Sequence, residues 1–97
     1  MTPAVLAFLM ALHRWVMPPS PFDTVAACES GGNWSADTGN GYYGGLQMTE
    51  RFWLTWGGAA YASRPDLASR TDQIAVAMRA SDGGLGYGPW PHCGRYA

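Results

Sequence analysis

The sequence contains little charge and no lysine. Charged residues make up 13% of the 97 residues, about half the share that is usual for a globular domain. All six basic side chains are arginine, and with seven acidic residues they leave a net charge of −1. The chain has no basic stripe, so we do not expect nucleic acid as a partner.

Cysteine and histidine are also scarce. The two cysteines, Cys28 and Cys93, allow one disulfide, half of a metal site, or no bond at all. A disulfide between them would stabilise the fold by roughly 4 kcal/mol and would indicate an oxidising compartment. His13 and His92 lie far apart in the sequence. Because no zinc-ligand spacing is present, the sequence predicts no metal site and no cofactor.

No hydrophobic run is long enough to cross a membrane. The apolar run near the N-terminus stops at His13 and Arg14, short of the length that a bilayer requires. Residues 1–17 are interpreted as a packing helix, as an export-like segment with weak membrane contact, or as the boundary of a fragment. No basic residue precedes the run and no small-residue cleavage site follows it, so a signal peptide is not evident.

The rest of the chain is predicted to form one domain. Residues 18–21 are rich in proline and predict a stiff linker, because proline fixes φ and interrupts helices. Residues 22–97 then form the domain, which we expect to be monomeric. Apolar residues make up 47% and aromatic residues 13% of the chain. This composition supports a packed core and suits a neutral, ring-shaped ligand such as a carbohydrate better than a polyanion.

Three helices are predicted, each beginning at a hydroxyl-bearing cap and ending at a glycine pair. They begin at Ser20, Thr49 and Ser69 and end at Gly31–Gly32, Gly57–Gly58 and Gly83–Gly84. The third helix is expected to bury Ile74, Ala77 and Met78. The Gly- and Tyr-rich residues 33–45 between the first two helices predict a loop or a short hairpin. The fold class is therefore mainly α, with α+β as the alternative.

Glu29 is the first candidate functional residue. It follows Phe22 by seven residues and Val25 by four, which places it on the apolar face of the first helix. An apolar environment raises the pKa of a carboxyl group, so the group retains a proton that it can donate as a general acid. The alternative is that Glu29 lies at the helix end and points into water.

Asp37 allows two interpretations. It is a candidate second carboxylate for cleavage of a glycosidic bond. An Asp beside Thr38 and Gly39 is, however, more typical of a turn in which the side chain bonds to the backbone. A calcium loop is excluded because Gly39 and Gly41 offer no side-chain oxygen and no downstream Glu matches.

Several side chains are candidates for sugar binding. Gln47 precedes the second helix, and its amide can donate to and accept from a sugar hydroxyl or acetamido group; a solvated side chain is the alternative. Aromatic rings that would stack on sugars, or else pack in the core, are Trp34, Tyr42, Tyr43 and Trp90.

Two blocks of sequence resemble the catalytic domain of the resuscitation-promoting factors, which are peptidoglycan-cleaving proteins of actinobacteria. The first block is Cys28-Glu29-Ser30-Gly31-Gly32-Asn33-Trp34, and the second is Thr38-Gly39-Asn40-Gly41-Tyr42-Tyr43-Gly44-Gly45-Leu46-Gln47. The resemblance continues to Trp90-Pro91-His92-Cys93 and so covers about residues 22–93.

The resemblance implies a small helical fold similar to lysozymes and lytic transglycosylases. It implies that Glu29 is the catalytic residue and that Cys28 and Cys93 form a disulfide. The substrate is then the β-1,4 bond between N-acetylmuramic acid and N-acetylglucosamine in peptidoglycan. The residues expected in the substrate cleft are Asp37, Thr38, Asn40, Tyr42, Gln47 and Trp90.

The chain departs from the family pattern at two places. Tyr87 and Pro89 stand in a segment that commonly reads Gly-Trp-Gly-Ala-Trp-Pro, and Met48 stands where Phe is common. These changes predict altered cleft fit with the chemistry retained. The expected setting is the cell wall outside a bacterium, or a phage that penetrates the wall. The alternative function is a non-catalytic module that binds glycan or signals with wall fragments.

Overall fold

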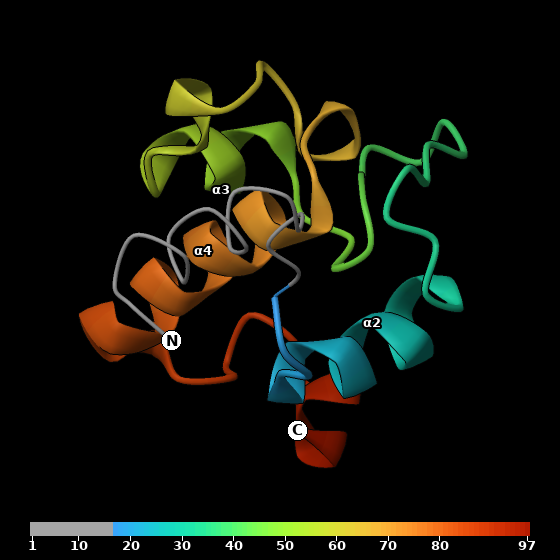
Figure 1. The fold of residues 1–97 in the computed structure, drawn as a ribbon, viewed down its shortest axis with the longest axis vertical. Coiled ribbons are helices and arrows are strands. Elements are labelled where there is room, and N and C mark those ends of the chain that lie inside the picture. Colours follow the sequence, from blue (N-terminus) through green and yellow to red (C-terminus); the bar gives the residue numbers. More distant parts are fainter. Residues whose placement is uncertain (1–16) are drawn as a thin grey trace, which may run out of the picture.

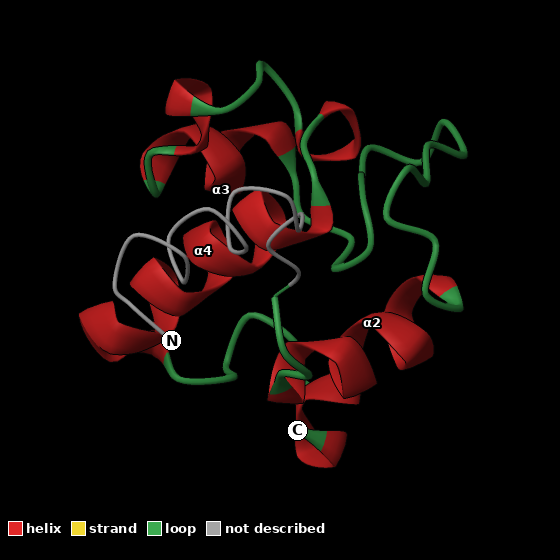
Figure 2. Cartoon of the chain, viewed as in Figure 1, coloured by secondary structure: helices red, strands yellow, loops and turns green. Residues whose placement is uncertain are grey.

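The structure is a computed structural model that describes residues 17–97. Short helices joined by long loops build this part of the chain (Figures 1 and 2). The elements in order are α2 (Pro21–Ser30), α3 (Glu50–Thr55), η1 (Gly58–Ala60), η2 (Pro65–Leu67), α4 (Arg70–Ala80), η3 (Ser81–Leu85) and η4 (Cys93–Tyr96). Apart from Met17, the N-terminal segment predicted for residues 1–17 lies outside the described residues. No helix within 17–97 is long and apolar enough to cross a bilayer.

The predicted helix caps are confirmed. The Ser20 hydroxyl accepts from the Phe22 N–H at 3.2 Å, and the Asp23 carboxylate accepts from the Ser20 N–H at 2.8 Å. This reciprocal pair satisfies two backbone donors that the first turn of a helix leaves free. Helix α2 ends where Gly31 takes the left-handed conformation at φ 66°. Thr49 and Ser69 cap α3 and α4 in the same way, through their hydroxyls.

The end of α4 differs from the prediction. Helix α4 ends at Ala80, before the glycine pair, and the chain continues into the wider turn η3, whose helical path is broken at Gly84, where φ is 104°. The turn is closed on both sides, since the Ser81 hydroxyl donates to the Gly86 carbonyl at 2.7 Å and the Gly86 N–H donates to the Ser81 carbonyl at 3.3 Å.

The buried face of α4 also differs from the prediction. Met78, expected on the buried stripe of α4, is 45% exposed, and Val76 is fully buried instead.

Residues 31–49 form a loop. Within residues 17–97 the only extended pairing consists of two isolated antiparallel bridges, Asp37 with Tyr43 and Tyr43 with Met48. The α+β alternative is therefore wrong for the described part of the chain, and the mainly α prediction is confirmed.

The core lies between α2, α3, α4 and the C-terminal segment. Its buried apolar side chains include Phe22, Val25, Ala26, Leu46, Met48, Trp53, Ile74, Val76, Ala77, Trp90 and Cys93. Trp90 stands at the junction, with its ring edge-on to Phe22 at 5.4 Å and to Phe52 at 6.0 Å between centroids. This one indole thereby joins α2, α3 and the chain after η3.

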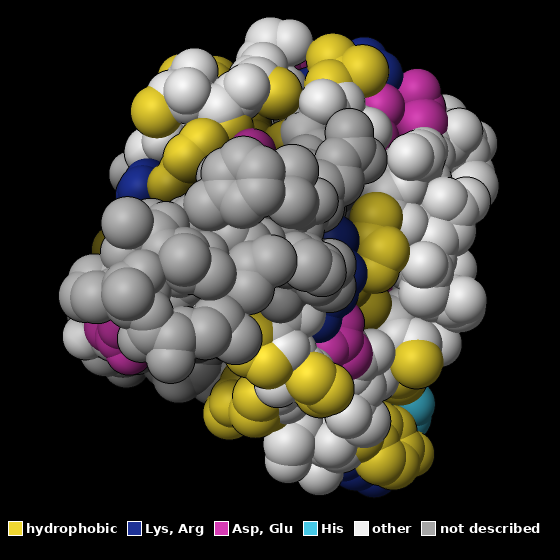
Figure 3. Space-filling view, in the orientation of Figure 1, with side chains coloured by type: hydrophobic (Ala, Val, Ile, Leu, Met, Phe, Trp, Pro, Cys, Tyr) yellow, Lys and Arg dark blue, Asp and Glu magenta, His cyan; other side chains and the backbone are white. Residues whose placement is uncertain are grey.

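A covalent bond and an ion pair fix α2 against the rest of the fold. A disulfide joins Cys28 of α2 to Cys93 of η4. At the other end of α2, the Arg70 guanidinium of α4 donates two hydrogen bonds of 2.7 Å to the Asp23 carboxylate. Figure 3 shows basic and acidic side chains next to one another on this face of the molecule, in line with the ion pairs Arg64–Asp37 and Arg70–Asp23.

Candidate active site

Glu29 lies in the last turn of α2, beyond the buried side chains of Phe22, Val25 and Ala26. Its side chain is half-buried and lines a pocket of about 330 Å³. The apolar spacing along α2 thus brings Glu29 to the edge of the core. Its side chain is partly exposed there, at the end of the helix, so it contacts both water and the pocket.

Three segments form the pocket around Glu29. Besides α2 these are the loop before α3 and the chain between η3 and η4. The lining residues are Glu29, Asn40, Tyr42, Gln47, Pro89, Trp90 and Pro91. A second pocket of about 90 Å³ shares Tyr42, Gln47, Pro89 and Trp90 with the first and extends to Met48, Thr49 and Phe52. The shared residues make the two pockets one groove, which is polar at Glu29 and apolar at Phe52.

Burial raises the pKa of the Glu29 carboxyl above its ordinary value. The cause is desolvation, since an ionised carboxylate loses hydration when apolar groups surround it. The positive charge of a protonated His92 opposes this effect and lowers the same pKa. The net result is a carboxyl that retains its proton to higher pH than a solvated glutamate, as a general acid requires.

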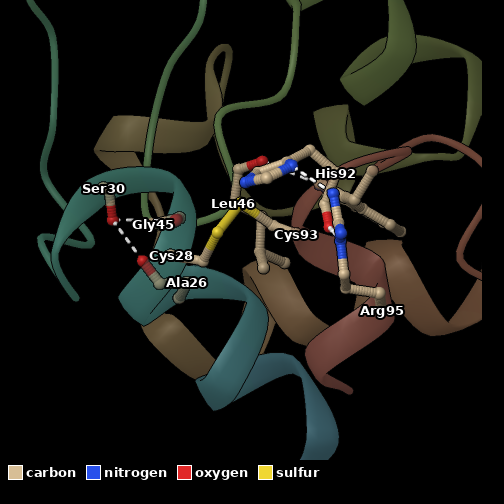
Figure 4. Close-up of a disulfide and its surroundings, with 9 residues drawn as sticks. Ala26, Cys28, Ser30, Gly45, Leu46, His92, Cys93 and Arg95 are labelled. Carbon is tan, nitrogen blue, oxygen red and sulfur yellow. Dashed lines mark hydrogen bonds between the residues drawn. A yellow bond between two sulfur atoms is a disulfide. The ribbon is translucent and has the colours of Figure 1, made fainter.

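The disulfide holds the two sides of the pocket together. Cys28 directly precedes Glu29, and Cys93 follows Pro91 by two residues. Figure 4 shows the bond between the two cysteines, which joins α2 to η4. His92 is held in turn by Arg95, whose Nε donates to the His92 carbonyl at 2.9 Å and whose Nη2 lies 2.6 Å from the ring Nδ1. The disulfide therefore joins the segment that carries Glu29 to the segment that carries Pro91, and both residues line the pocket.

Gly45 joins α2 to α4 through two hydrogen bonds. Its N–H donates to the Gln73 side-chain carbonyl at 2.9 Å, and its own carbonyl accepts from the Ser30 hydroxyl at 2.8 Å. A Cβ on Gly45 would lie 2.3 Å from the Trp34 ring, so glycine is required for this close approach. The two bonds join α4 to the residue that follows Glu29.

Sequence reasoning missed Gln73. Its side chain is fully buried, and its amide nitrogen donates to the carbonyls of Trp34 at 2.8 Å and Ala68 at 3.0 Å. All the polar atoms of this amide are therefore paired, as burial demands. The available signal was its spacing of four residues before Ala77 on α4, which places a polar side chain on the buried face.

Gln47 has an unusual backbone. Its φ is 53°, the only positive φ outside glycine among residues 17–97. Its side-chain nitrogen donates to the Gly44 carbonyl at 3.0 Å, and the residue lines both pockets. A left-handed conformation is unfavourable for a side chain of this size, and such strain is concentrated at functional positions.

The structure brings four of the predicted cleft residues to Glu29. These are Asn40, Tyr42, Gln47 and Trp90. Tyr42 is 49% exposed and offers a ring face, whereas Trp90 is 3% exposed and is mainly a core residue. The Trp90 indole N–H donates to the Leu46 carbonyl at 2.8 Å, which joins this pocket-lining residue to the chain just before Gln47.

The other predicted cleft residues lie elsewhere. Thr38 and Asp37 do not line either pocket. One oxygen of Asp37 accepts from the Gly39 N–H at 3.3 Å, which is the predicted turn, and the other accepts from Arg64 at 3.3 Å. Among the candidate aromatics, Tyr43 lies under the Arg64 guanidinium at 4.5 Å.

The described residues contain no group of three His, Cys, Asp or Glu side chains close enough to hold a metal ion.

Comparison with known proteins places this arrangement in a family. The model of the transglycosylase-like domain matches residues 17–93. The chain is 47% identical over 87 residues to the resuscitation-promoting factor Rpf1 of Corynebacterium glutamicum. It is 50% identical over 86 residues to RpfA and 54% identical over 78 residues to RpfC, both of Mycobacterium tuberculosis.

The matches cover most of this chain but only part of each relative. They span 90%, 89% and 78% of this chain, and 45%, 21% and 52% of Rpf1, RpfA and RpfC respectively. The matched region includes α2 with Glu29, the loop of residues 31–49 and the disulfide partner Cys93. The chain belongs to the transglycosylase-like domain family, as a domain of the resuscitation-promoting factor type.

Proposed function

We propose that the chain cleaves the β-1,4 bond between N-acetylmuramic acid and N-acetylglucosamine in peptidoglycan, with Glu29 as general acid and then base. The observation that carries this proposal is the position of Glu29, half-buried in the groove with a raised pKa. Membership of the transglycosylase-like family supports the reaction class. The neutral groove, with Tyr42, Asn40 and Gln47 around Glu29, suits uncharged sugar rings.

The reaction begins with proton transfer. Protonated Glu29 donates its proton to the glycosidic oxygen, the bond from that oxygen to C1 of the muramic acid breaks, and C1 gains oxocarbenium character. The ionised Glu29 then accepts the proton of the sugar's own C6 hydroxyl, whose oxygen bonds to C1. The product is a 1,6-anhydro sugar, and Glu29 is again protonated without consumption of water.

The absence of a second acid in the groove favours this route over hydrolysis. Glu29 is the only carboxyl among the described residues that line the two pockets. A glycosidase that activates water or forms a covalent intermediate uses two carboxyl groups beside the bond. Asp37, the candidate for the second, is engaged by Arg64 and Gly39. We therefore favour a lytic transglycosylase over a muramidase.

We place the reaction outside the cell, at the wall. Peptidoglycan is there, and a disulfide such as that of Cys28 with Cys93 persists in oxidising compartments. The bacterial relatives favour a bacterial setting over the phage alternative.

The test is digestion of purified peptidoglycan, with products identified by mass spectrometry. We expect anhydro-muropeptides, whose mass is lower by one water molecule than the mass of the corresponding hydrolysis products. Muropeptides with the mass of the hydrolysis products would show that the enzyme is a muramidase. Glu29→Gln keeps the shape of the side chain but removes the acid, so turnover should fall at least about a hundredfold while glycan binding persists. Full activity in this variant would refute the role of Glu29.

The alternative of a non-catalytic glycan-binding module makes a different prediction in the same assay. Wild type and Glu29→Gln would then both bind glycan and neither would release product from the wall. Asp82→Asn serves as the control, because Asp82 is an exposed carboxylate outside the groove, and it should retain wild-type activity.

A further inference from the structure

The loop of residues 37–43, called here the cleft wall, has few supports of its own. Asn40 and Tyr42 of the cleft wall line the pocket, while residues 37–42 are exposed along its outer side. Its internal side-chain bonds are local, from the Gly39 N–H to Asp37 and from the Tyr42 N–H to Asn40. At its base, Asp37 and Tyr43 pair as an antiparallel bridge, the Gly44 N–H donates to the Ala36 carbonyl at 2.8 Å, and Tyr43 exchanges backbone hydrogen bonds of 2.9 and 3.0 Å with Met48. These contacts fix the base of the loop, whereas among residues 17–97 its tip, residues 38–42, makes hydrogen bonds only within the loop itself.

Arg64 supplies the missing support from outside. Its Nη2 donates to Asp37 at 3.3 Å, and its guanidinium lies 4.5 Å from the centre of the Tyr43 ring. Among residues 17–97, it is the only side chain outside the cleft wall that hydrogen-bonds to a side chain within it. One guanidinium thus contacts both ends of the cleft wall.

The base of this support is rigid. Arg64 donates to both oxygens of Asp66, at 2.7 and 2.9 Å, and the Asp66 side chain is only 6% exposed. The next residue, Pro65, is buried. A two-point bond to a buried carboxylate fixes the plane of the guanidinium, which lysine cannot reproduce.

We propose that Arg64 is a positioning residue that holds the cleft wall at the spacing from Glu29 at which Asn40 and Tyr42 bind a glycan strand, and that Asp37 is its point of attachment. The inference rests on the proposed function, because it assumes a glycan in the groove. In this proposal Asp37 acts in substrate binding, through Arg64, and is not a second catalytic acid.

The structure separates this role from the chemical step. Glu29 lies on α2, which the disulfide and the Ser30–Gly45 hydrogen bond hold independently of the cleft wall. Loosening of the cleft wall therefore weakens substrate binding and leaves proton transfer intact. In kinetic terms, KM rises and kcat stays the same.

The test compares Arg64→Met, Arg64→Lys and Asp37→Asn with wild type on solubilised, uncrosslinked peptidoglycan strands. We expect Arg64→Met to raise KM about fivefold, since it removes a cation–π contact as well as an ion pair. Asp37→Asn keeps the oxygen that accepts from Gly39 and loses the charge, so KM should rise about twofold. Arg64→Lys should lie between wild type and Arg64→Met.

Arg79→Met is the matched control. Arg79 lies 5.3 Å over the Tyr61 ring and donates to its hydroxyl at 2.6 Å, so the substitution removes a similar pair that does not line the groove. Its KM should equal that of wild type. The double variant Arg64→Met/Asp37→Asn should be no worse than Arg64→Met alone, because both changes remove one contact.

Two results would overturn the proposal. One is a lower kcat with unchanged KM in Asp37→Asn, which is the behaviour of a second catalytic carboxyl. The other is an unchanged KM in Arg64→Met. If near-UV circular dichroism shows that Arg64→Met does not fold, Arg64→Lys and Asp37→Asn take its place. An unchanged KM in both of these variants would then overturn the proposal. If wild type binds but does not cleave, the proposed function fails and the dissociation constant of the same strands, from tryptophan fluorescence, replaces KM.

Discussion

The side-chain carbonyl of Gln73 on α4 accepts a hydrogen bond from the backbone N–H of Gly45 at 2.9 Å, two residues before Gln47 of the groove that contains Glu29. The two residues are 28 positions apart. The same amide donates to two further carbonyls, so one buried side chain joins α4, the loop before α3 and the turn after η2.

Replacement of Gln73 should be among the most damaging single changes. Gln73→Met fills a similar volume but leaves the Gly45 N–H and the carbonyls of Trp34 and Ala68 without partners. We expect the free energy of unfolding to fall by about 3 kcal/mol, measured by urea denaturation. Gln73→Glu keeps the acceptor for Gly45 but buries a charge, so its loss should be greater at neutral than at acidic pH. Wild-type stability in Gln73→Met would contradict this account.

The disulfide should contribute much of the stability. Cys28 and Cys93 are separated by 65 positions, and closing a loop of that length stabilises a fold by about 4 kcal/mol. Cys28→Ser/Cys93→Ser should lose this amount in chemical denaturation. A reducing agent should lower the free energy of unfolding of wild type to that of the double variant. The free energy of unfolding of the variant should not change. A wild-type midpoint that is insensitive to reductant would show that the bridge does not contribute.

The ion pair of Asp23 with Arg70 should make stability depend on acid. The Arg70 hydrogen bonds lower the pKa of Asp23 below its ordinary value of 3.8. A lowered native pKa means that the stabilisation is present above the unfolded-state pKa and is lost as the pH falls through the native value. Asp23→Asn, which retains an oxygen for the helix cap, should lose about 1 kcal/mol at pH 7.

The pH profile of unfolding checks this interpretation. Wild type and Asp23→Asn should differ in midpoint at pH 7. The difference should shrink only below the ordinary pKa of 3.8 and vanish below the lowered native pKa, where the carboxylate is protonated in the folded protein. Asp82→Asn, an exposed carboxylate, should follow wild type at every pH. A difference that persists at low pH would assign the effect to the cap geometry and not to the charge.

His92 should influence the pH dependence of activity. A positive charge on its ring lowers the pKa of Glu29, opposing the effect of burial. His92→Gln removes that charge, so the Glu29 pKa rises and Glu29 holds its proton to higher pH. The limb on which activity falls with rising pH should therefore shift upward in pH, as seen in kcat/KM profiles. Arg51→Gln, which removes a charge from the exposed face of α3, should leave the limb in place.

The sequence by itself determined the local features. The cap hydroxyls of Ser20, Thr49 and Ser69 act on backbone donors two or three residues away, so the starts of the helices could be read directly. The spacing of Phe22, Val25 and Glu29 placed the candidate acid at the edge of the core for the same reason. Local hydrogen bonds and helical periodicity involve neighbours in sequence, and a pattern of residues specifies them.

Which distant groups meet depends on how the helices and loops pack together. Arg64 reaches Asp37 across 27 positions and Trp90 reaches Leu46 across 44, and no periodicity encodes such pairs. The side chain of Asp37 is equally suited to a groove or to a turn, and the fold resolved this by bringing a guanidinium to it. Long-range contacts arise when whole elements pack, because burial of apolar surface selects the arrangement and polar partners are then paired within it.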